Sequence, residues 1–375
     1  MGRWIYYTKR LARRWEKEST TRGEPVVIAL DAMGGDRGPT ANLEGALIAV
    51  AEQPGLIVKL VGRQDELKEA LGKSFLPEEI EIIHAEDALG MNEPATLALR
   101  RPNCSIIKAV ELLVSGKAHG LVSMGNTGAV VASSLVKLGK IGGVERPALM
   151  TLFPTLEKRP SIVLDIGANV DSRPEHILSF AEMGSLYAEE VLERKRPTVA
   201  LLSIGAEPTK GNSTVKEAHK LLRKSTLNFV GNIEGGEILH GTADVIVTDG
   251  FVGNTILKFA EGSIGFFKRI AKKGRRKNLF SMAGSVLMSG GFKKLMREFD
   301  YAEYGGAPLL GVRGNVIVGH GKSTPLAISN AISLSYVMVN AQIDKKIASY
   351  MRLKKENVEN ENIRDRVEPP RENPD

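Results

Sequence analysis

Two glycine-rich turns that follow apolar runs are the parts of this sequence best suited to bind an anion. The first, Asp31-Ala32-Met33-Gly34-Gly35-Asp36, follows residues 26–30 and precedes a helical apolar pattern over residues 43–50. A strand, a glycine turn and a helix in this order place backbone N–H groups at a helix start, where an anion binds. Asp31 and Asp36 beside such a site hold a cation, accept hydrogen bonds or brace the loop, and all three interpretations stay open.

The second turn, Gly125-Asn126-Thr127-Gly128, follows a predicted strand at residues 120–124 and opens a predicted helix at residues 129–138. Its N–H groups and the Thr127 hydroxyl are suited to a phosphate, and a purely structural turn is the alternative. The glycine spacing differs from the dinucleotide fingerprint. Gly321-Lys322-Ser323 resembles the end of a P-loop, but Val316 replaces its first glycine. Nucleotide binding is therefore weakly supported.

Other predicted strands lie at residues 56–62, 80–84, 161–164, 198–203, 228–230, 244–247 and 316–318, and polar clusters follow the last five. Parallel strands bring their carboxyl ends to one edge of a sheet, where ligands bind, so we expect one composite site. Lys210 could neutralise a phosphate or an oxyanion, with a solvated lysine as the alternative, and His320 is a candidate hydrogen-bond donor. The candidates in these clusters are Asp165, Gly167, Asn169, Lys210, Gly211, Asn212, Asn232, Glu234, Asp249, Gly250, Asn254 and His320.

Cysteine and histidine chemistry receives little support. Cys104, the one cysteine, has no histidine near it in sequence, so a covalent acyl-cysteine is a weak hypothesis. The six histidines show no metal-ligand spacing. We predict neither a metal nor another cofactor.

The alternation of predicted strands and helices indicates an α/β fold, with helices on both faces of a mostly parallel sheet. A single cysteine excludes a disulfide framework and favours a reducing, cytoplasmic compartment. The longest uncharged stretch, residues 118–136, is interpreted as strand, loop and helix because it contains Ser123, Gly125, Asn126, Thr127, Gly128, Ser133 and Ser134.

The chain ends differ in composition from residues 25–345, which we take as the α/β domain. Residues 1–24 form a basic extension that could be a flexible arm or a short membrane-surface helix. Residues 346–375 mix charges without a clear apolar period, so we expect a disordered tail.

The net charge of +7 is concentrated in one segment. Ten basic and no acidic side chains lie between Lys268 and Arg297, interleaved with apolar ones. This pattern predicts an amphipathic hairpin over residues 263–300 for an anionic membrane or an acidic carrier protein, with a solvated helix face as the alternative. No nucleic-acid motif accompanies it, so nucleic acid is not expected. The candidate contacts are Phe266, Phe267, Lys272, Lys273, Arg275, Arg276, Phe280 and Leu287.

Seven motifs in order, within residues 26–343, together resemble the bacterial phosphate acyltransferase (PlsX) family. They are Asp31-Ala32-Met33-Gly34-Gly35-Asp36, Gly125-Asn126-Thr127-Gly128-Ala129, Leu164-Asp165-Ile166-Gly167-Ala168-Asn169-Val170-Asp171, Lys210-Gly211-Asn212, Gly231-Asn232-Ile233-Glu234-Gly235, Asp249-Gly250-Phe251-Val252-Gly253-Asn254 and Glu303-Tyr304-Gly305-Gly306-Ala307-Pro308-Leu309-Leu310-Gly311. The sequence departs from the family pattern at Arg100-Arg101-Pro102-Asn103-Cys104 and at Gly319-His320-Gly321-Lys322-Ser323.

The resemblance implies a three-layer α/β/α Rossmann-like sandwich, similar to isopropylmalate dehydrogenase and phosphotransacetylase. It implies reversible transfer of a long-chain fatty acyl group from acyl-[acyl carrier protein] to inorganic phosphate. The acyl phosphate would feed glycerophospholipid synthesis through a glycerol-3-phosphate acyltransferase. It also implies a homodimer attached peripherally to the inner face of the cell membrane.

We expect Asn126, Thr127 and Lys210 to hold phosphate, with asparagines orienting the substrate or donating to the oxyanion. The asparagines are Asn169, Asn232 and Asn254, and the carboxylates expected to brace loops are Asp31, Asp36, Asp165 and Asp249. Two rival functions stay open: a short-chain phosphotransacylase that uses acyl-coenzyme A, and a non-catalytic membrane scaffold for lipid synthesis.

Overall fold

A single 11-stranded sheet forms the centre of the molecule, in the order β3-β2-β1-β4-β11-β10-β5-β6-β9-β7-β8. The computed structural model describes residues 24–157, 159–274 and 305–367. One half of the sheet consists of parallel strands whose short apolar sequences suit burial on both faces. These strands are β1 (Val26–Asp31), β2 (Leu56–Gly62), β3 (Ile80–His84), β4 (Gly120–Ser123) and β11 (Asn315–Val318).

The other half contains β6 (Ser161–Leu164), β7 (Thr198–Leu202), β8 (Asn228–Ile233) and β9 (Val245–Val247), which are parallel to one another. Strands β5 (Ala148–Phe153) and β10 (Ala307–Leu310) join the halves through antiparallel pairings. These three antiparallel steps make the two halves run in opposite directions. Their carboxyl ends therefore do not share one edge, unlike the arrangement expected from the sequence.

The central strands β5 and β10 are not among the strands expected from the sequence. Most of the expected strands are apolar runs followed by a glycine turn and a helix. Strand β5 instead ends just before Pro154 and pairs with the next strand, β6, so no helix follows it. The core of the sheet thus depends on a strand without the local signal that marks its neighbours.

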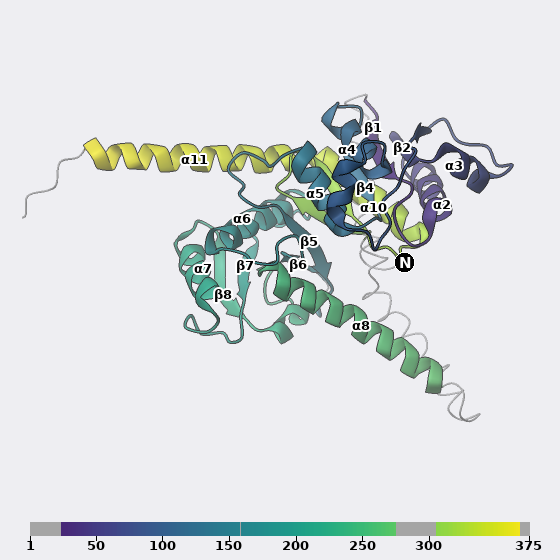
Figure 1. The fold of residues 1–375 in the computed structure, drawn as a ribbon. Coiled ribbons are helices and arrows are strands. Elements are labelled where there is room, and N and C mark those ends of the chain that lie inside the picture. Colours follow the sequence, from purple (N-terminus) through teal and green to yellow (C-terminus); the bar gives the residue numbers. More distant parts are fainter. Residues whose placement is uncertain (1–23, 158, 275–304, 368–375) are drawn as a thin grey trace, which may run out of the picture.

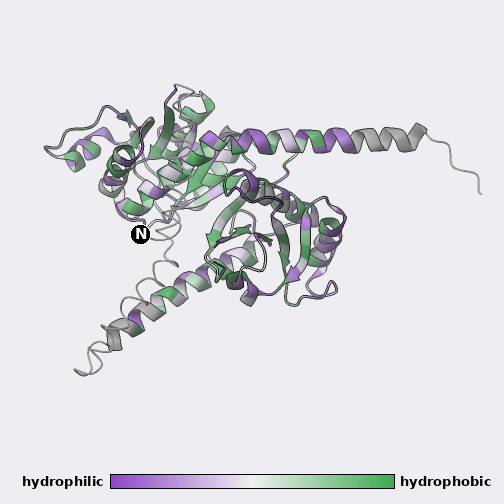
Figure 2. Cartoon of the chain, turned by 180° about the vertical axis from the view of Figure 1, so that it is seen from behind, coloured by the Kyte–Doolittle hydropathy of each residue, from purple (hydrophilic) through white to green (hydrophobic). Residues whose placement is uncertain are grey.

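Helices cover both faces of the sheet and complete three layers (Figure 1). One buried cluster joins the sheet to α2, α3, α6, α7, α10 and the start of α11, and a second joins it to α4, α5 and α8. The strands are mostly hydrophobic and the exposed helix faces carry the hydrophilic residues (Figure 2). The helices are α2 (Gly38–Glu52), α3 (Gln64–Leu71), α4 (Ser105–Val114), α5 (Thr127–Lys137), α6 (Pro174–Glu190), α7 (Ser213–Lys224), α8 (Gly250–Gly274), α10 (Pro325–Ala341) and α11 (Ile343–Val367), with short turns η1 (Ala95–Arg100) and η2 (Gly235–His240).

Helix α11 corrects the expectation of a disordered tail from residue 346, because the chain is helical to Val367. Ile347 and Met351 are buried in the core, and Lys354 Nζ lies 2.6 Å from the buried Glu182 Oε1 on α6. The first three turns of α11 therefore pack on the domain. This packing stabilises the helical conformation of the charged remainder of α11, which extends from the body (Figure 1).

The predicted basic hairpin and N-terminal extension fall largely outside the described residues. Helix α8 contains the part of the hairpin up to Gly274, and Phe266 on it is 60% exposed. Phe267, Lys272 and Lys273 belong to the same helix, whereas Arg275, Arg276, Phe280 and Leu287 lie beyond the described residues. Among the described helices no single one meets the length and hydropathy needed to span a bilayer; the bent pair α10–α11 does so by composition, and α10 is mostly buried in the core.

Candidate active site

A cavity of about 520 Å³ lies between the two halves of the sheet. Strand β5 provides its floor through Leu149, Thr151 and Phe153, which alternate onto the same face. The loops after β1, β4 and β11 form one side, and the loop after β6 with helix α8 forms the other. Loops from both halves meet here because the cavity lies beside the central strands, where the strand direction changes.

The start of α5 forms the polar side of this cavity. Asn126 caps the helix: its Oδ1 accepts from Ala129 N at 3.1 Å, and its Nδ2 donates to the carbonyls of Met91 and Glu93. Gly125, Thr127 and Gly128 line the cavity. The first N–H groups of a helix have no acceptor within it, so this side combines amide donors, a hydroxyl and the positive end of a helix dipole.

The glycine turn after β1 packs directly against the start of α5. A Cβ added to Gly34 would lie 2.6 Å from Gly125 N, so only glycine permits this approach. Ser123 Oγ donates to Asp31 Oδ2 at 2.7 Å. Burial raises the pKa of Asp31, and this hydrogen bond opposes the shift. The Asp31 carboxylate therefore stabilises the turn. Asp36 lines the cavity, and its backbone N–H donates to Gly321 O.

Asp165 organises the loop after β6. Its buried carboxylate accepts from the N–H groups of Leu149, Gly167, Ala168 and Asn169 and from the Asn169 carboxamide, at 2.8–3.1 Å. Asn169 Nδ2 also donates to Pro147 O at 2.7 Å, and Asn169 is not among the residues lining the cavity. This network fixes Gly167 and Ile166, which do line the cavity.

The first turn of α8 packs against the same loop. Cβ atoms added at Gly250 and Gly253 would lie 2.2 Å from Asn169 O and 1.9 Å from Asp165 O. Asp249 caps the helix by accepting from Val252 N at 2.8 Å. The close packing brings Asn254 to the cavity wall beside Gly167.

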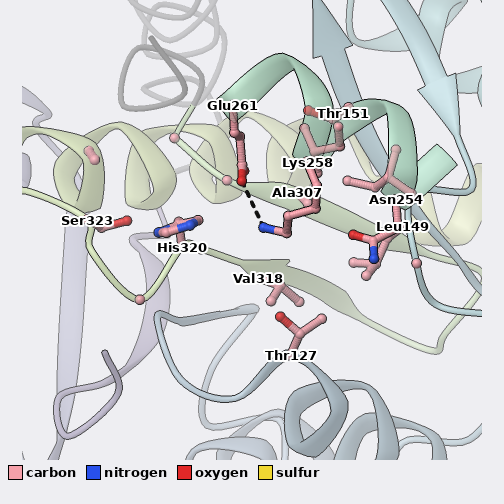
Figure 3. Close-up of a pocket in the computed structure, with 18 of the residues that line it drawn as sticks. Thr127, Leu149, Thr151, Asn254, Lys258, Glu261, Ala307, Val318, His320 and Ser323 are labelled. Carbon is pink, nitrogen blue, oxygen red and sulfur yellow. Dashed lines mark hydrogen bonds and ion pairs between the residues drawn. The ribbon is translucent and has the colours of Figure 1, made fainter. Parts of the chain in front are cut away.

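Two further side chains of α8, Lys258 and Glu261, were not identified from the sequence. Their charged groups are 2.8 Å apart and both line the cavity. Figure 3 shows this pair on one side of the cavity and Thr127 on the other. The spacing of Asn254, Lys258 and Glu261, four and then three, places them on one helix face and is the signal that could have found them.

His320 follows β11 and lies at the other end of the cavity from Asn254 (Figure 3). Its Nδ1 accepts from the Lys322 N–H at 3.1 Å, so a neutral ring carries its hydrogen on Nε2. Burial is the main cause that lowers the pKa of His320, and Glu261 opposes the shift. The ring is therefore a neutral donor near pH 7.

The predicted residues after β7 and β8 do not line this cavity. Lys210 is exposed, and Gly211 (φ +96°) lies in the turn where Asn212 Oδ1 caps α7. Asn232 contacts His219 Nδ1 and the Glu207 carbonyl, and Glu234 caps η2. These side chains follow β7 and β8, which lie at the end of the sheet beyond β9, so the structure does not bring them together with Thr127.

Cys104 is fully buried at the start of α4, and burial raises the pKa of its thiol. A buried neutral thiol is a poor nucleophile. In the parts of the chain that the structure covers, no group of three His, Cys, Asp or Glu side chains is arranged to hold a metal ion.

Residues 26–346 match the family model described as "Fatty acid synthesis protein". The chain belongs to this family. It is 45% identical over 322 residues to a phosphate acyltransferase of a Nitratiruptor species, in an alignment that covers 86% of this chain and 96% of that one. It is 47% identical over 323 residues to a phosphate acyltransferase of Dictyoglomus turgidum, covering 85% and 96%. The chain is thus an enzyme of the acyltransferase class.

Solved structures with the same fold are more distant in sequence. A phosphotransacetylase from Streptococcus pyogenes matches with a TM-score of 0.58 and 15% identity, covering 86% of this chain and 95% of that one. EutD phosphotransacetylase from Staphylococcus aureus gives a TM-score of 0.52 at 17% identity, covering 88% and 99%. The predicted phosphotransacetylase-like α/β sandwich is confirmed.

Proposed function

We propose that this enzyme transfers a long-chain fatty acyl group from acyl-[acyl carrier protein] to inorganic phosphate and forms acyl phosphate for glycerophospholipid synthesis. The observation that carries the proposal is the cavity itself. It joins a helix start with a hydroxyl, at Thr127, to an apolar wall formed by residues such as Leu149, Phe153, Leu257 and Ile264. A phosphate and an acyl chain thus have complementary surfaces in one cavity.

Phosphate would bind at the start of α5. The N–H groups of Thr127 and Gly128 and the Thr127 hydroxyl donate to its oxygens, and the helix dipole favours its charge. Lys258, held by Glu261, supplies a cation from the facing wall. His320 donates to the phosphate through Nε2–H. It is a neutral donor, and Lys258 supplies the cation.

The reaction requires a phosphate oxygen to attack the thioester carbonyl. A bond forms between that oxygen and the carbonyl carbon, the carbonyl oxygen gains negative charge, and the carbon–sulfur bond then breaks to release a thiolate. We assign Asn254 to donate to the developing oxyanion, because it lies at the acyl end of the cavity beside Gly167. One such donor contributes ~3 kcal/mol, and fixed positioning contributes several more.

The residues after β7 and β8 are proposed to contact the acyl carrier protein instead of the phosphate. Lys210 is exposed and outside the cavity lining, so we assign it to the anionic portion of the acyl carrier rather than to the transferred phosphate. Replacing Lys210 by alanine should then raise the KM for acyl carrier protein and leave the KM for phosphate unchanged. A rise in the phosphate KM instead would return Lys210 to the phosphate site.

We also propose a homodimer bound to the anionic inner face of the cell membrane, where a glycerol-3-phosphate acyltransferase consumes the product. Support for the membrane contact comes from α8, where Phe259, Phe266 and Ile270 are exposed on a helix that extends from the body. The segment beyond Gly274 adds basic and apolar residues in sequence.

The test is acyl phosphate formation by purified full-length protein, with palmitoyl-carrier protein and palmitoyl-coenzyme A compared at equal concentration, each with and without phosphate. Phosphate-dependent product from the carrier thioester is expected. Product from palmitoyl-coenzyme A but not from palmitoyl-carrier protein would establish the phosphotransacylase alternative. Absence of product from both, with folded protein bound to liposomes, would favour the scaffold.

A further inference from the structure

A second cavity, of about 670 Å³, lies at the carboxyl-terminal end of α5, away from the cavity described above. Helix α5 separates the two: Thr127 at its first position lines the catalytic cavity, and Leu135 near its end lines the second. An 11-residue helix is about 16 Å long. The second cavity is therefore a distinct place on the surface, with its own residues.

Three cationic side chains surround this second cavity, and one carboxylate accompanies them. The cations are Lys140, Arg146 and Arg173, and the carboxylate is Glu145. Glu145 Oε2 lies 3.1 Å from His176 Nε2, so this carboxylate is hydrogen-bonded to a histidine of the cavity wall. Within the described parts of the chain, no ion pair to a carboxylate is found for Arg146 or Arg173. The cavity thus has an excess of positive charge with two guanidinium groups available to an anion.

The scaffold that carries these cations is ordered by buried contacts. Ile141 N donates to Gly311 O at 3.0 Å, and Val144 N donates to Ile141 O at 3.0 Å; both side chains are buried. His176 is 4% exposed, and its Nδ1 accepts from Arg173 N at the start of α6. The basic groups therefore project from fixed backbone, which reduces the entropy lost when they bind a ligand.

We propose that this second cavity binds a small phosphate ester. Planar guanidinium groups bind phosphate oxygens bidentately. A cavity with two arginines, a lysine and one carboxylate therefore favours a phosphate group. The volume exceeds that of inorganic phosphate and falls in the range of small-molecule sites. The lining contains Leu135, Gly139 and Pro147 but no phenylalanine, tyrosine or tryptophan, so no ring-stacking surface for a nucleobase is present among the described residues of this wall.

The experiment is calorimetric titration of inorganic pyrophosphate into the full-length protein and three variants. Arg146→Gln with Arg173→Gln removes the two guanidinium groups while keeping polar side chains at exposed positions. The matched control, Arg223→Gln with Lys224→Gln, removes the same charge from the last turn of α7, outside the cavity. Thr127→Val tests the catalytic cavity, and circular dichroism confirms that each variant is folded.

A binding event is expected that weakens at least about tenfold in the Arg146/Arg173 variant and persists in the Arg223/Lys224 and Thr127 variants. Three results would overturn the proposal: absence of pyrophosphate binding to wild type at millimolar concentration, equal loss in the matched control, or loss only in the Thr127 variant. The readout is binding, so it does not depend on which acyl donor the enzyme uses.

Discussion

Lys258 Nζ and Glu261 Oε2 lie 2.8 Å apart on consecutive turns of α8, and both side chains line the cavity between the sheet halves. Glu261 is 22% exposed and Lys258 is 57% exposed, so the carboxylate is the anchored member of the pair. The ammonium group is thereby held over the cavity, opposite the start of α5 (Figure 3). This relationship assigns a cation to the proposed phosphate site.

Replacing Lys258 by methionine should lower kcat/KM for phosphate by about tenfold to a hundredfold, because a charge-assisted contact to phosphate is lost. Steady-state acyl phosphate formation measures this effect. Lys220→Met is the matched control, since Lys220 forms a pair with Glu217 at the same spacing on α7, outside the cavity. Equal activity of the Lys258 and Lys220 variants would remove Lys258 from the site.

Gly253 should tolerate no side chain, because a Cβ there would meet Asp165 O at 1.9 Å. Gly253→Ala should reduce the free energy of unfolding by about 1–3 kcal/mol and displace α8, which would also lower activity. Gly262→Ala on the same helix meets nothing within 4 Å and should stabilise it by about 0.5–1 kcal/mol. Urea unfolding of both variants measures the contrast; equal stability would show that the α8–Asp165 contact is not tight.

His320 should make stability depend on pH. Burial lowers its pKa in the folded chain below the ordinary value of 6.5, so the unfolded chain takes up the proton first as pH falls. The free energy of unfolding should therefore decline below about pH 6.5. Urea midpoints at about pH 7.5 and about pH 5.5 should differ less in His320→Gln than in wild type. An unchanged difference would mean that His320 does not contribute.

Cys104→Ala should retain turnover within about twofold, because the thiol is buried and its pKa is raised by burial. The deleted sulfur leaves a small cavity, so a loss of about 1 kcal/mol in stability is expected. Acyl phosphate formation and thermal unfolding are measured on the same sample. Folded but inactive protein would revive the acyl-cysteine hypothesis.

The sequence predicted the parallel strands from their short apolar runs, and it predicted the turns after β1 and β4 because glycine and a helical pattern follow each run. It did not predict that the sheet reverses direction. That reversal depends on β5 and β10, whose antiparallel partners are set by long-range pairing, as in Leu309 opposite Leu149. Lys210 and Asn232 follow β7 and β8 at the end of the sheet, so they lie outside the cavity that Thr127 lines, although all three follow strand ends.

The start of α8 shows the same limit at the level of single side chains. Asp249-Gly250-Phe251-Val252-Gly253-Asn254 was identified as a motif, and its glycines prove to be contact points with the Asp165 loop. Lys258 and Glu261 were not identified because a lysine and a glutamate three residues apart are common on exposed helices. Only the position of α8 over the cavity gives this pair a role.

The dependence of acyl phosphate formation on phosphate concentration, in wild type and Thr127→Val, tests the central claim most directly. The variant removes one hydroxyl from the start of α5 and keeps the side-chain shape; Thr255→Val, whose exposed hydroxyl bonds only to Phe251 O among the contacts described, is the control. We predict that Thr127→Val raises the KM for phosphate about tenfold or more and leaves the KM for acyl carrier protein unchanged. An unchanged phosphate KM in Thr127→Val would contradict phosphate binding at this helix start.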